Sequence, residues 1–265
     1  MIALYQVDSF ATEIFKGNPA AVCPLDAWLS DDVMQAVAAE NNLSETAFFV
    51  PDLSGNADYG LRWFTPKSEV VMCGHGTLAT AWVLFNELAP DKDVVSFSTL
   101  SGVLVVTRGQ DGLMIMDFPV CSLRPAPHPE DLPRALGGPA LDFCTASNDM
   151  RLAVLGSAQA VRDLKPNLQA VAQMGKFGVI VTAKGDGDVD FVSRFFAPQV
   201  GIAEDPVTGS AHTVLVPYWA KRLKKETFRA QQISKRGGEI QCQLDGDRVK
   251  LSGRAVLYMK GEVYL

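Results

Sequence analysis

The sequence predicts an α+β protein made of two similarly folded halves, and three observations carry this prediction. First, 265 residues correspond to one large domain or two modest ones. Second, one short motif occurs at residues 62–66 and again at 194–198. Third, β-type runs alternate with helix-period segments in both halves. Hydrophobic residues make up 48% and charged residues 20%, which is typical of a globular protein with a buried core.

The repeat relates the first half to the second by a constant offset. The segment R-W-F-T-P begins at Arg62 and R-F-F-A-P begins at Arg194, a separation of 132 residues. The same offset, without gaps, aligns further β-type runs: 21–22 with 153–154, 47–49 with 179–181, and 58–59 with 190–191. A shared register over roughly sixty residues predicts that the halves have a common fold.

The first elements of each half follow in the same order. Short strands are expected around 20–22 and 152–155. A helix is expected from Ser30 to Glu40, with Ser30 as its N-cap ahead of two aspartates in the first turn.

The next strands are expected at 46–50 and 179–182, because these runs are rich in β-branched and aromatic residues. A turn at 185–188, which alternates glycine and aspartate, then leads into a strand that ends in the repeated motif.

Each half continues with a loop of small residues and an apolar helix. The loop 73–77 leads into a helix over 78–85, and the loop 205–210 leads into a helix over 211–215. Both helices are apolar nearly all round, which predicts that each is buried in the middle of its half. The basic cluster at 221–226 is interpreted as the solvated end of a helix.

These two helix starts are candidate binding sites for a carboxylate. The first turn of a helix has unpaired N–H groups and a partial positive charge, and glycine lets a ligand approach the backbone closely. The offset of 132 aligns Cys73 with Asp205, so the two residues are predicted to occupy equivalent positions in the two halves. His75 and Ser210 stand at the two helix starts as hydrogen-bond partners.

Three side chains are candidates for the chemistry itself. A thiolate at Cys73 would be favoured by the helix start, which would raise the reactivity of this cysteine. Asp205 would accept a hydrogen bond from a substrate amine or hydroxyl. Glu45 precedes the apolar run 46–49. Its carboxyl would be partly desolvated there and suited to proton transfer, although an exposed loop glutamate is an equal alternative.

Composition excludes several classes of partner. The net charge of -6 and the lack of a basic stripe argue against nucleic acid. The sequence has no run of about 18 apolar residues, so no membrane span is predicted. The N-terminus does not resemble a signal peptide. The five cysteines have scattered spacings, which indicates neither a disulfide framework nor a zinc ribbon. A cytoplasmic location is therefore expected.

The same residues match two other enzyme motifs only in part. The spacing Gly74-x-Gly76-x-x-Ala79 matches a dinucleotide-binding fingerprint, but the expected acidic residue about 20 positions later is missing. Ser210, His212 and Asp205 lack the second glycine of a hydrolase nucleophile elbow.

A metal site formed by Cys73, His75 and His212 would have only three ligands, scattered along the sequence. No metal site is therefore predicted. The alternative from another functional class is a protein that binds a small molecule without catalysing a reaction.

Motifs across most of the chain resemble the phenazine-biosynthesis PhzF-like isomerase family, which is related to diaminopimelate epimerase and proline racemase. The motifs are V-D-S-F (7–10), F-K-G-N-P-A-A-V (15–22), N-L-S-E-T-A-F (42–48), R-W-F-T-P (62–66), C-G-H-G-T-L-A (73–79), D-F-P (117–119) and R-F-F-A-P-x-x-G-I-x-E-D-P-V-T-G-S-A (194–211).

The resemblance implies two pseudo-symmetric domains, each a mixed, largely antiparallel sheet curled around a central helix. The expected bounds are 1–118, to which 256–265 return, and 119–255. The resemblance further implies a homodimer, no cofactor, and a small carboxylate substrate held in a cleft between the domains.

The resemblance also assigns roles to individual residues. It makes Glu45 the general acid/base that moves a proton between substrate carbons, with His75 and Asp205 completing the catalytic set. The expected substrate-binding residues are Asn18, Cys73, Gly74, Gly76, Thr208, Gly209 and Ser210. In the epimerase relatives two cysteines act as paired bases at the positions of Cys73 and Asp205. An asymmetric pair of these two residues in a racemase or epimerase is therefore the alternative mechanism.

Overall fold

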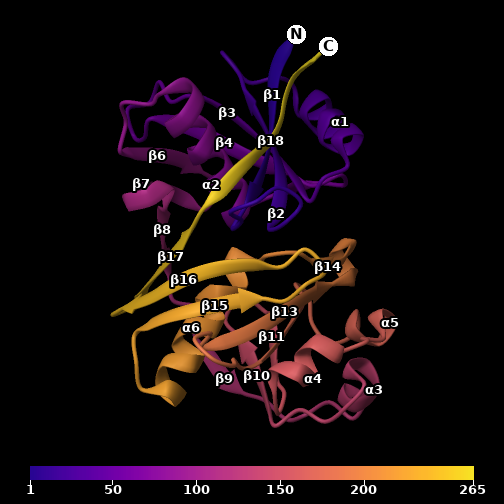
Figure 1. The fold of residues 1–265 in the computed structure, drawn as a ribbon. Coiled ribbons are helices and arrows are strands. Elements are labelled where there is room, and N and C mark those ends of the chain that lie inside the picture. The colour runs from indigo at the N-terminus through magenta and orange to yellow at the C-terminus, as the bar shows by residue number, and fades with distance from the viewer. The chain divides into compact units, whose positions relative to one another are not determined.

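A computed structural model describes residues 1–265, and the chain divides into two compact units (Figure 1). Unit 1 contains residues 1–117 and 252–265, and unit 2 contains residues 118–251. The sequence placed these changes of unit after residues 118 and 255.

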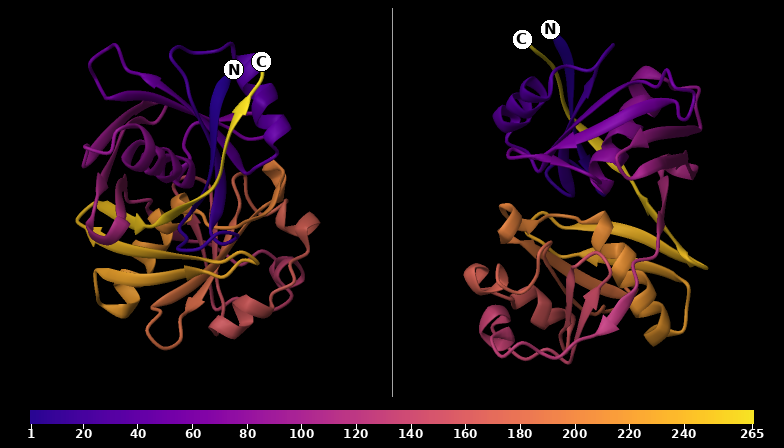
Figure 2. Two further views of the ribbon diagram at one scale, coloured as in Figure 1. Left: turned by 45° about the horizontal axis from the view of Figure 1, so that its top comes forward. Right: turned by 180° about the vertical axis from the view of Figure 1, so that it is seen from behind.

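Unit 1 is a mixed sheet with two α-helices. Its elements are β1 (Ile2–Ser9), β2 (Asn18–Pro24), α1 (Asp31–Asn41), β3 (Glu45–Pro51), β4 (Tyr59–Phe64), β5 (Glu69–Val70), α2 (Gly74–Val83), a π-helix (Leu84–Leu88), β6 (Val94–Thr99), β7 (Gly102–Arg108), a 3-10 turn (Gln110–Gly112), β8 (Met114–Pro119) and β18 (Ala255–Val263). Strand β1 pairs antiparallel with β18 although they come from opposite ends of the chain (Figure 2).

Unit 2 has a longer succession of short elements. They are β9 (Leu123–Pro125), α3 (Leu132–Leu136), β10 (Asp142–Ala146), β11 (Arg151–Val154), α4 (Ala158–Asp163), α5 (Leu168–Val171), β12 (Val179–Lys184), β13 (Phe191–Ala197), a 3-10 turn (Pro198–Val200), β14 (Ile202–Asp205), α6 (Gly209–Leu223), β15 (Thr227–Gln232), β16 (Gly238–Asp245) and β17 (Arg248–Gly253).

Strand pairing follows the same succession in both units. In unit 1, β2 and β3 are parallel, β3 and β4 antiparallel, β4 and β6 parallel, and β6 and β7 antiparallel. In unit 2, the corresponding pairs are β11 and β12, β12 and β13, β13 and β15, and β15 and β16, with the same directions. Mixed sheets with few helices confirm the predicted α+β class.

A buried helix lies inside each unit, as the apolar sequences predicted. Helix α2 packs against β1, β2 and β3, and each of its residues except Trp82 is buried. Helix α6 packs against β16 and extends well beyond the predicted end at 215. The two buried helices begin at Gly74 and Gly209, earlier than the expected starts at 78 and 211, because residues of the small-residue loops form their first turns.

Separate hydrophobic cores stabilise the two units. In unit 1, Met34 and Val37 of α1 pack with Phe48 and Phe64 of the sheet. In unit 2, the short helices α3, α4 and α5 contribute to a second cluster. Ser30 stands at the N-cap of α1 as predicted, but its side chain makes no capping hydrogen bond, and its backbone carbonyl accepts from Val33 and Met34 instead.

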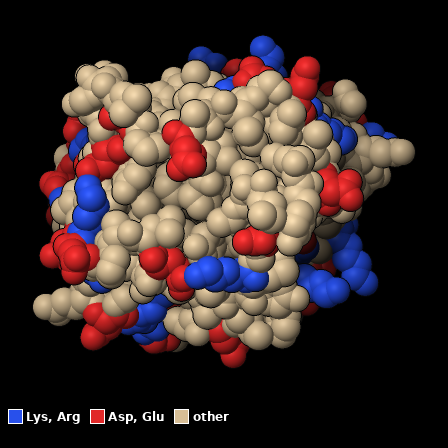
Figure 3. Space-filling model, turned by 90° about the horizontal axis from the view of Figure 1, so that it is seen from above, with Lys and Arg blue, Asp and Glu red and all other residues tan.

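The surface is of mixed charge, and the cysteines are buried. On the face drawn in Figure 3, basic and acidic residues are interspersed among uncharged ones. All five cysteines are buried and none forms a disulfide. Every helix of the protein is too short or too polar to cross a lipid bilayer.

Candidate functional site

Unit 1 brings three of the predicted site residues together around the start of α2. Cys73 is the N-cap of this helix, His75 lies in its first turn, and Glu45 is the first residue of β3. One ligand-type atom from each of the three lies within 4.8 Å of the others, and all three side chains are buried. The sequence alternative of an exposed loop Glu45 is wrong, since this residue is only 8% exposed.

The surrounding strands hold these side chains in place. Glu45 pairs with Ala20 of the parallel neighbour β2, which fixes where β3 begins. Asn18, the first residue of β2, places its Nδ2 3.2 Å from Nδ1 of His75. The Ser9 hydroxyl at the end of β1 donates a hydrogen bond of 2.8 Å to the His75 backbone carbonyl. Three strand ends therefore position the imidazole.

A close contact between His75 and Glu45 forms the centre of this group. Nε2 of His75 lies 2.9 Å from Oε2 of Glu45. Burial lowers the pKa of His75, but the neighbouring Cys73 and the Glu45 carboxylate outweigh this effect and raise it well above its usual value. The Glu45 Oε2 atom has no regular hydrogen-bond partner despite this contact, so the oxygen has acceptor capacity left.

The electrostatics of Cys73 differ from the sequence expectation. Burial, and then the Glu45 charge, raise the pKa of the Cys73 thiol to about 11. The expected reactive thiolate is therefore wrong: desolvation and a neighbouring anion outweigh the helix start. The sulfur instead accepts a hydrogen bond of 3.3 Å from the backbone N–H of Gly76 and caps the helix.

Gly76 is required by the close packing of Trp63. A Cβ atom at this position would lie 2.9 Å from Cδ1 of Trp63 and 3.0 Å from Sγ of Cys73. The Trp63 side chain is almost fully buried and its Nε1 has no hydrogen-bond partner. The indole N–H is thus a buried donor beside the start of α2.

Unit 2 gathers its predicted residues at the start of α6. Thr208 is the N-cap, followed by Gly209 and Ser210 in the first turn. The Thr208 hydroxyl donates a hydrogen bond of 2.5 Å to Oδ2 of Asp205. Gln232 also belongs to this group. Its side-chain N–H donates a hydrogen bond of 2.7 Å to the Asp205 carbonyl, and its Oε1 accepts one of 2.8 Å from the Thr208 N–H.

The structure corrects the predicted equivalence of Cys73 and Asp205. Cys73 and Thr208 are both helix N-caps, which makes the local offset 135 (208 − 73) rather than 132. A matching pair of salt bridges supports this alignment: Arg62 binds Glu69 with two hydrogen bonds, and Arg194 binds Glu204 in the same way.

Loop length explains this change of register. The two partners are seven residues apart in unit 1 and ten apart in unit 2. The additional length contains the 3-10 turn that precedes β14. Thr208 is therefore the counterpart of Cys73, and the ungapped offset fails after the repeated motif.

The candidate metal ligands also change. His212 lies on α6 in unit 2, where its Nδ1 is 2.8 Å from the Thr208 carbonyl. Glu45 takes its place beside Cys73 and His75, and this trio is a group that could hold a divalent metal ion. A metal there would require the Cys73 thiolate, which burial disfavours.

Three residues that contribute to the groups at the starts of α2 and α6 were not predicted from the sequence. Ser9 had a signal, since it belongs to the motif at 7–10. Trp63 lies in the repeated motif, but its role as a buried donor depends on the packing of Gly76. Gln232 had no signal at all, because it comes from β15, a strand that no motif marks.

Comparisons with known proteins identify the family. Residues 7–261 match the family model of phenazine biosynthesis-like proteins, PhzC-PhzF. An uncharacterized isomerase of Pseudomonas aeruginosa is 48% identical over 100% of this chain and 99% of its own. An uncharacterized isomerase of Halalkalibacterium halodurans is 43% identical over 99% of this chain and 98% of its own. These names confirm the expected enzyme class.

Solved structures agree with the sequence matches. The crystal structure of a PhzF-family phenazine biosynthesis protein from Enterococcus faecalis has a TM-score of 0.93 and 46% identity, covering 100% of this chain and 99% of that one. A predicted epimerase from Pseudomonas aeruginosa, at 22% identity and a TM-score of 0.81, shares the fold over the full length of both chains. The chain therefore belongs to the PhzC-PhzF family of phenazine biosynthesis-like proteins.

Proposed function

We propose that this protein is an isomerase that moves a proton between carbons of a small carboxylate substrate, with Glu45 as the general acid/base. The observation that carries the proposal is the Glu45 oxygen 2.9 Å from the His75 ring nitrogen, buried and with no regular hydrogen-bond partner. A carboxylate with spare acceptor capacity in a desolvated site suits proton abstraction from carbon. The isomerase names of the relatives support the same class of reaction.

The proposed reaction has two steps. In the first, a C–H bond of the substrate breaks, its proton moves to Glu45, and the electron pair enters the conjugated system of the substrate. In the second, Glu45 returns a proton to another carbon of that system. Atoms and charge balance without a redox partner. The proton on His75 beside Glu45 stabilises the carboxylate between turnovers, because the two opposite charges are buried together.

Backbone groups at the start of α2 would stabilise the negative charge that develops on the substrate. The sequence assigned this role to groups near Gly76, but the Gly76 N–H already donates to the Cys73 sulfur. The N–H groups of Gly74 and His75, in the first turn, are the better candidates. In unit 2, the α6 start has no side-chain cap, so Gly209 and Ser210 offer similar backbone donors for a carboxylate.

In unit 2, Asp205 is proposed to bind a polar group of a small-molecule ligand. Its carboxylate is only 6% exposed and already accepts a hydrogen bond from Thr208. A carboxylate accepts hydrogen bonds, so the matching group of the ligand would be an amine or hydroxyl donor.

The proposal is tested by a screen for proton exchange. Small carboxylates, including amino acids and cyclic unsaturated acids, are incubated with the protein in heavy water and examined by mass spectrometry. We expect at least one compound to gain deuterium at carbon. If carboxylates bind, as measured by calorimetry, but none gains deuterium, the protein is a binding protein without this catalysis.

The two-base mechanism is separated by Cys73→Ser. With Glu45 as the base, this variant should keep deuterium incorporation within about threefold of the wild type, because serine can also cap a helix. With Cys73 as a base, the loss should be at least about a hundredfold, since serine is a far weaker base. Cys144→Ser, which alters another buried cysteine in unit 2, is the matched control.

A further inference from the structure

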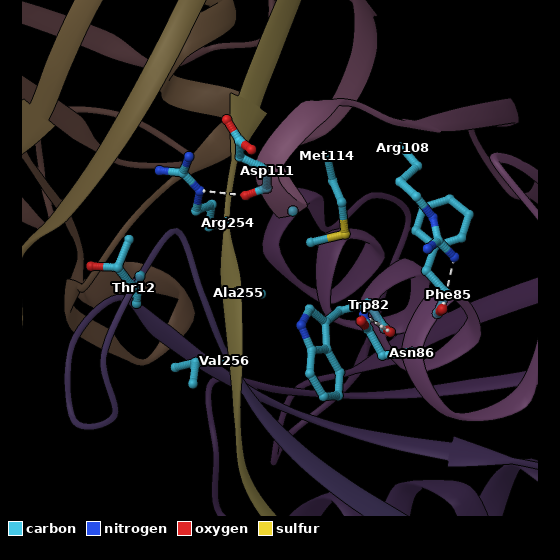
Figure 4. Close-up of a pocket in the computed structure, with 12 residues that line it drawn as sticks. Thr12, Trp82, Phe85, Asn86, Arg108, Asp111, Met114, Arg254, Ala255 and Val256 are labelled. Carbon is cyan, nitrogen blue, oxygen red and sulfur yellow. Dashed lines mark hydrogen bonds between the residues drawn. The ribbon is translucent and has the colours of Figure 1, made fainter. Parts of the chain in front are cut away.

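A pocket of about 440 Å³ lies in unit 1 at the opposite end of α2 from Cys73 and His75 (Figure 4). Its walls come from the end of α2 and the π-helix, from the β7–β8 connection, and from the beginning of β18. The volume is in the range of sites that bind small molecules. None of the residues proposed above for catalysis lines this pocket.

The middle of the pocket is apolar. Trp82, the one residue of α2 that is not buried, lines the pocket together with Met114, which lies above it in Figure 4. Phe85 lines the pocket from the π-helix, where the Ala89 N–H bonds to the Leu84 carbonyl. π-Helical turns are rare and occur often at functional sites. A half-buried indole beside a methionine offers a surface on which a flat ring can stack.

Arg254 supplies a cation at one side of the pocket. Its Nε donates a hydrogen bond of 2.9 Å to the backbone carbonyl of Asp111, which has a positive φ of 54°. This turn orients the guanidinium, and no carboxylate lies within ion-pair distance of it. The two terminal nitrogens of Arg254 thus keep their donors for a ligand.

Arg108 supplies a second cation on the opposite side, as Figure 4 shows. Its Nη2 donates to the carbonyls of Phe85 and Pro90, at 2.7 and 2.9 Å. These bonds satisfy carbonyls at the end of the helix, whose partial negative charge would otherwise repel an anion. Its nearest carboxylate is the largely exposed Asp93, at 3.8 Å.

We propose that this pocket binds a small monocarboxylate that carries a flat apolar ring. The Arg254 guanidinium would hold the carboxylate, because its planar donors match two carboxylate oxygens. The ring would lie on Trp82 and Met114. The charged residues that line the pocket are Arg108, Arg254 and Asp111, and Arg108 is also paired with Asp93 outside the lining. Arg254 is therefore the cation that is left to hold one carboxylate.

The experiment is a calorimetric titration with benzoate, compared with neutral benzyl alcohol. Benzoate should bind more tightly than the alcohol and should quench Trp82 fluorescence, a signal that Trp82→Phe removes. Arg254→Gln should weaken benzoate binding at least about tenfold, because a charge-assisted pair of hydrogen bonds is lost. Arg254→Lys, which keeps the charge but loses the planar fork, should give an intermediate affinity.

Two controls locate the binding site. Arg134→Gln changes an exposed arginine in unit 2 and should leave the dissociation constant unchanged. Glu45→Gln should also leave it unchanged, since Glu45 lies outside this pocket. Equal affinity for benzoate and benzyl alcohol would overturn the proposal, as would an Arg254→Gln variant that is folded by circular dichroism and binds like the wild type. Loss of binding in Glu45→Gln would assign benzoate to the proposed catalytic site instead.

Discussion

Replacing Glu45 by Gln is expected to reduce deuterium incorporation into the substrate by about 10²- to 10⁴-fold, the usual contribution of a general acid/base. Glutamine has nearly the same shape and keeps the contact distance to His75, but it cannot take a proton from carbon. The measurement is the rate of deuterium uptake at saturating substrate in heavy water. Because the binding surface is preserved, substrate affinity should change by much less than the rate.

The matched control for this substitution is Glu40→Gln, which makes the same chemical change at an exposed position of α1. Glu40→Gln should exchange deuterium at the wild-type rate. Thermal unfolding of both variants separates loss of chemistry from loss of fold. If folded Glu45→Gln protein retains wild-type exchange, another group takes the proton and the proposed role of Glu45 is wrong.

Much of the fold was predictable from local patterns. Strand runs such as 46–50 and 179–182 are dense in β-branched and aromatic residues, and both lie in strands. The all-round apolar character of 78–85 correctly predicted a buried helix. The return of the last strand to the first half was expected only from the family resemblance, and its antiparallel pairing with β1 was not predicted. A contact between the two ends of the chain leaves no periodic signal in either segment.

The site was less predictable where it depends on geometry. The Glu45 and His75 pair comes from two elements whose approach is fixed by the pairing of β2 with β3. The equivalence of Cys73 with Thr208 was missed because three additional residues between Arg194 and Glu204 shift the register, and an ungapped comparison cannot detect them. The high pKa of the Cys73 thiol needed the burial and the neighbouring charge to be known.

His212 is expected to make the protein less stable as the pH falls from about 6.5 to 4. Desolvation by complete burial lowers the pKa of this histidine from 6.5 to about 4 in the folded protein. Between these values the unfolded chain binds a proton that the folded protein does not, so the free energy of unfolding decreases with falling pH. A difference of about 2.5 pKa units corresponds to roughly 3 kcal/mol. Chemical denaturation at pH 7, 6, 5 and 4 measures this loss.

His212→Asn isolates the contribution of this residue. Asparagine can still donate to the Thr208 carbonyl, which His212 Nδ1 contacts at 2.8 Å, but it does not titrate. The variant should therefore lose most of the pH dependence between 6.5 and 4, whatever its stability at pH 7. His128→Asn, at an exposed position, should keep the wild-type slope. His75 does not interfere, because its raised pKa affects stability only above pH 6.5, where the contribution of its ion pair is lost as the pH rises. An unchanged slope in His212→Asn would mean that other groups cause the acid sensitivity.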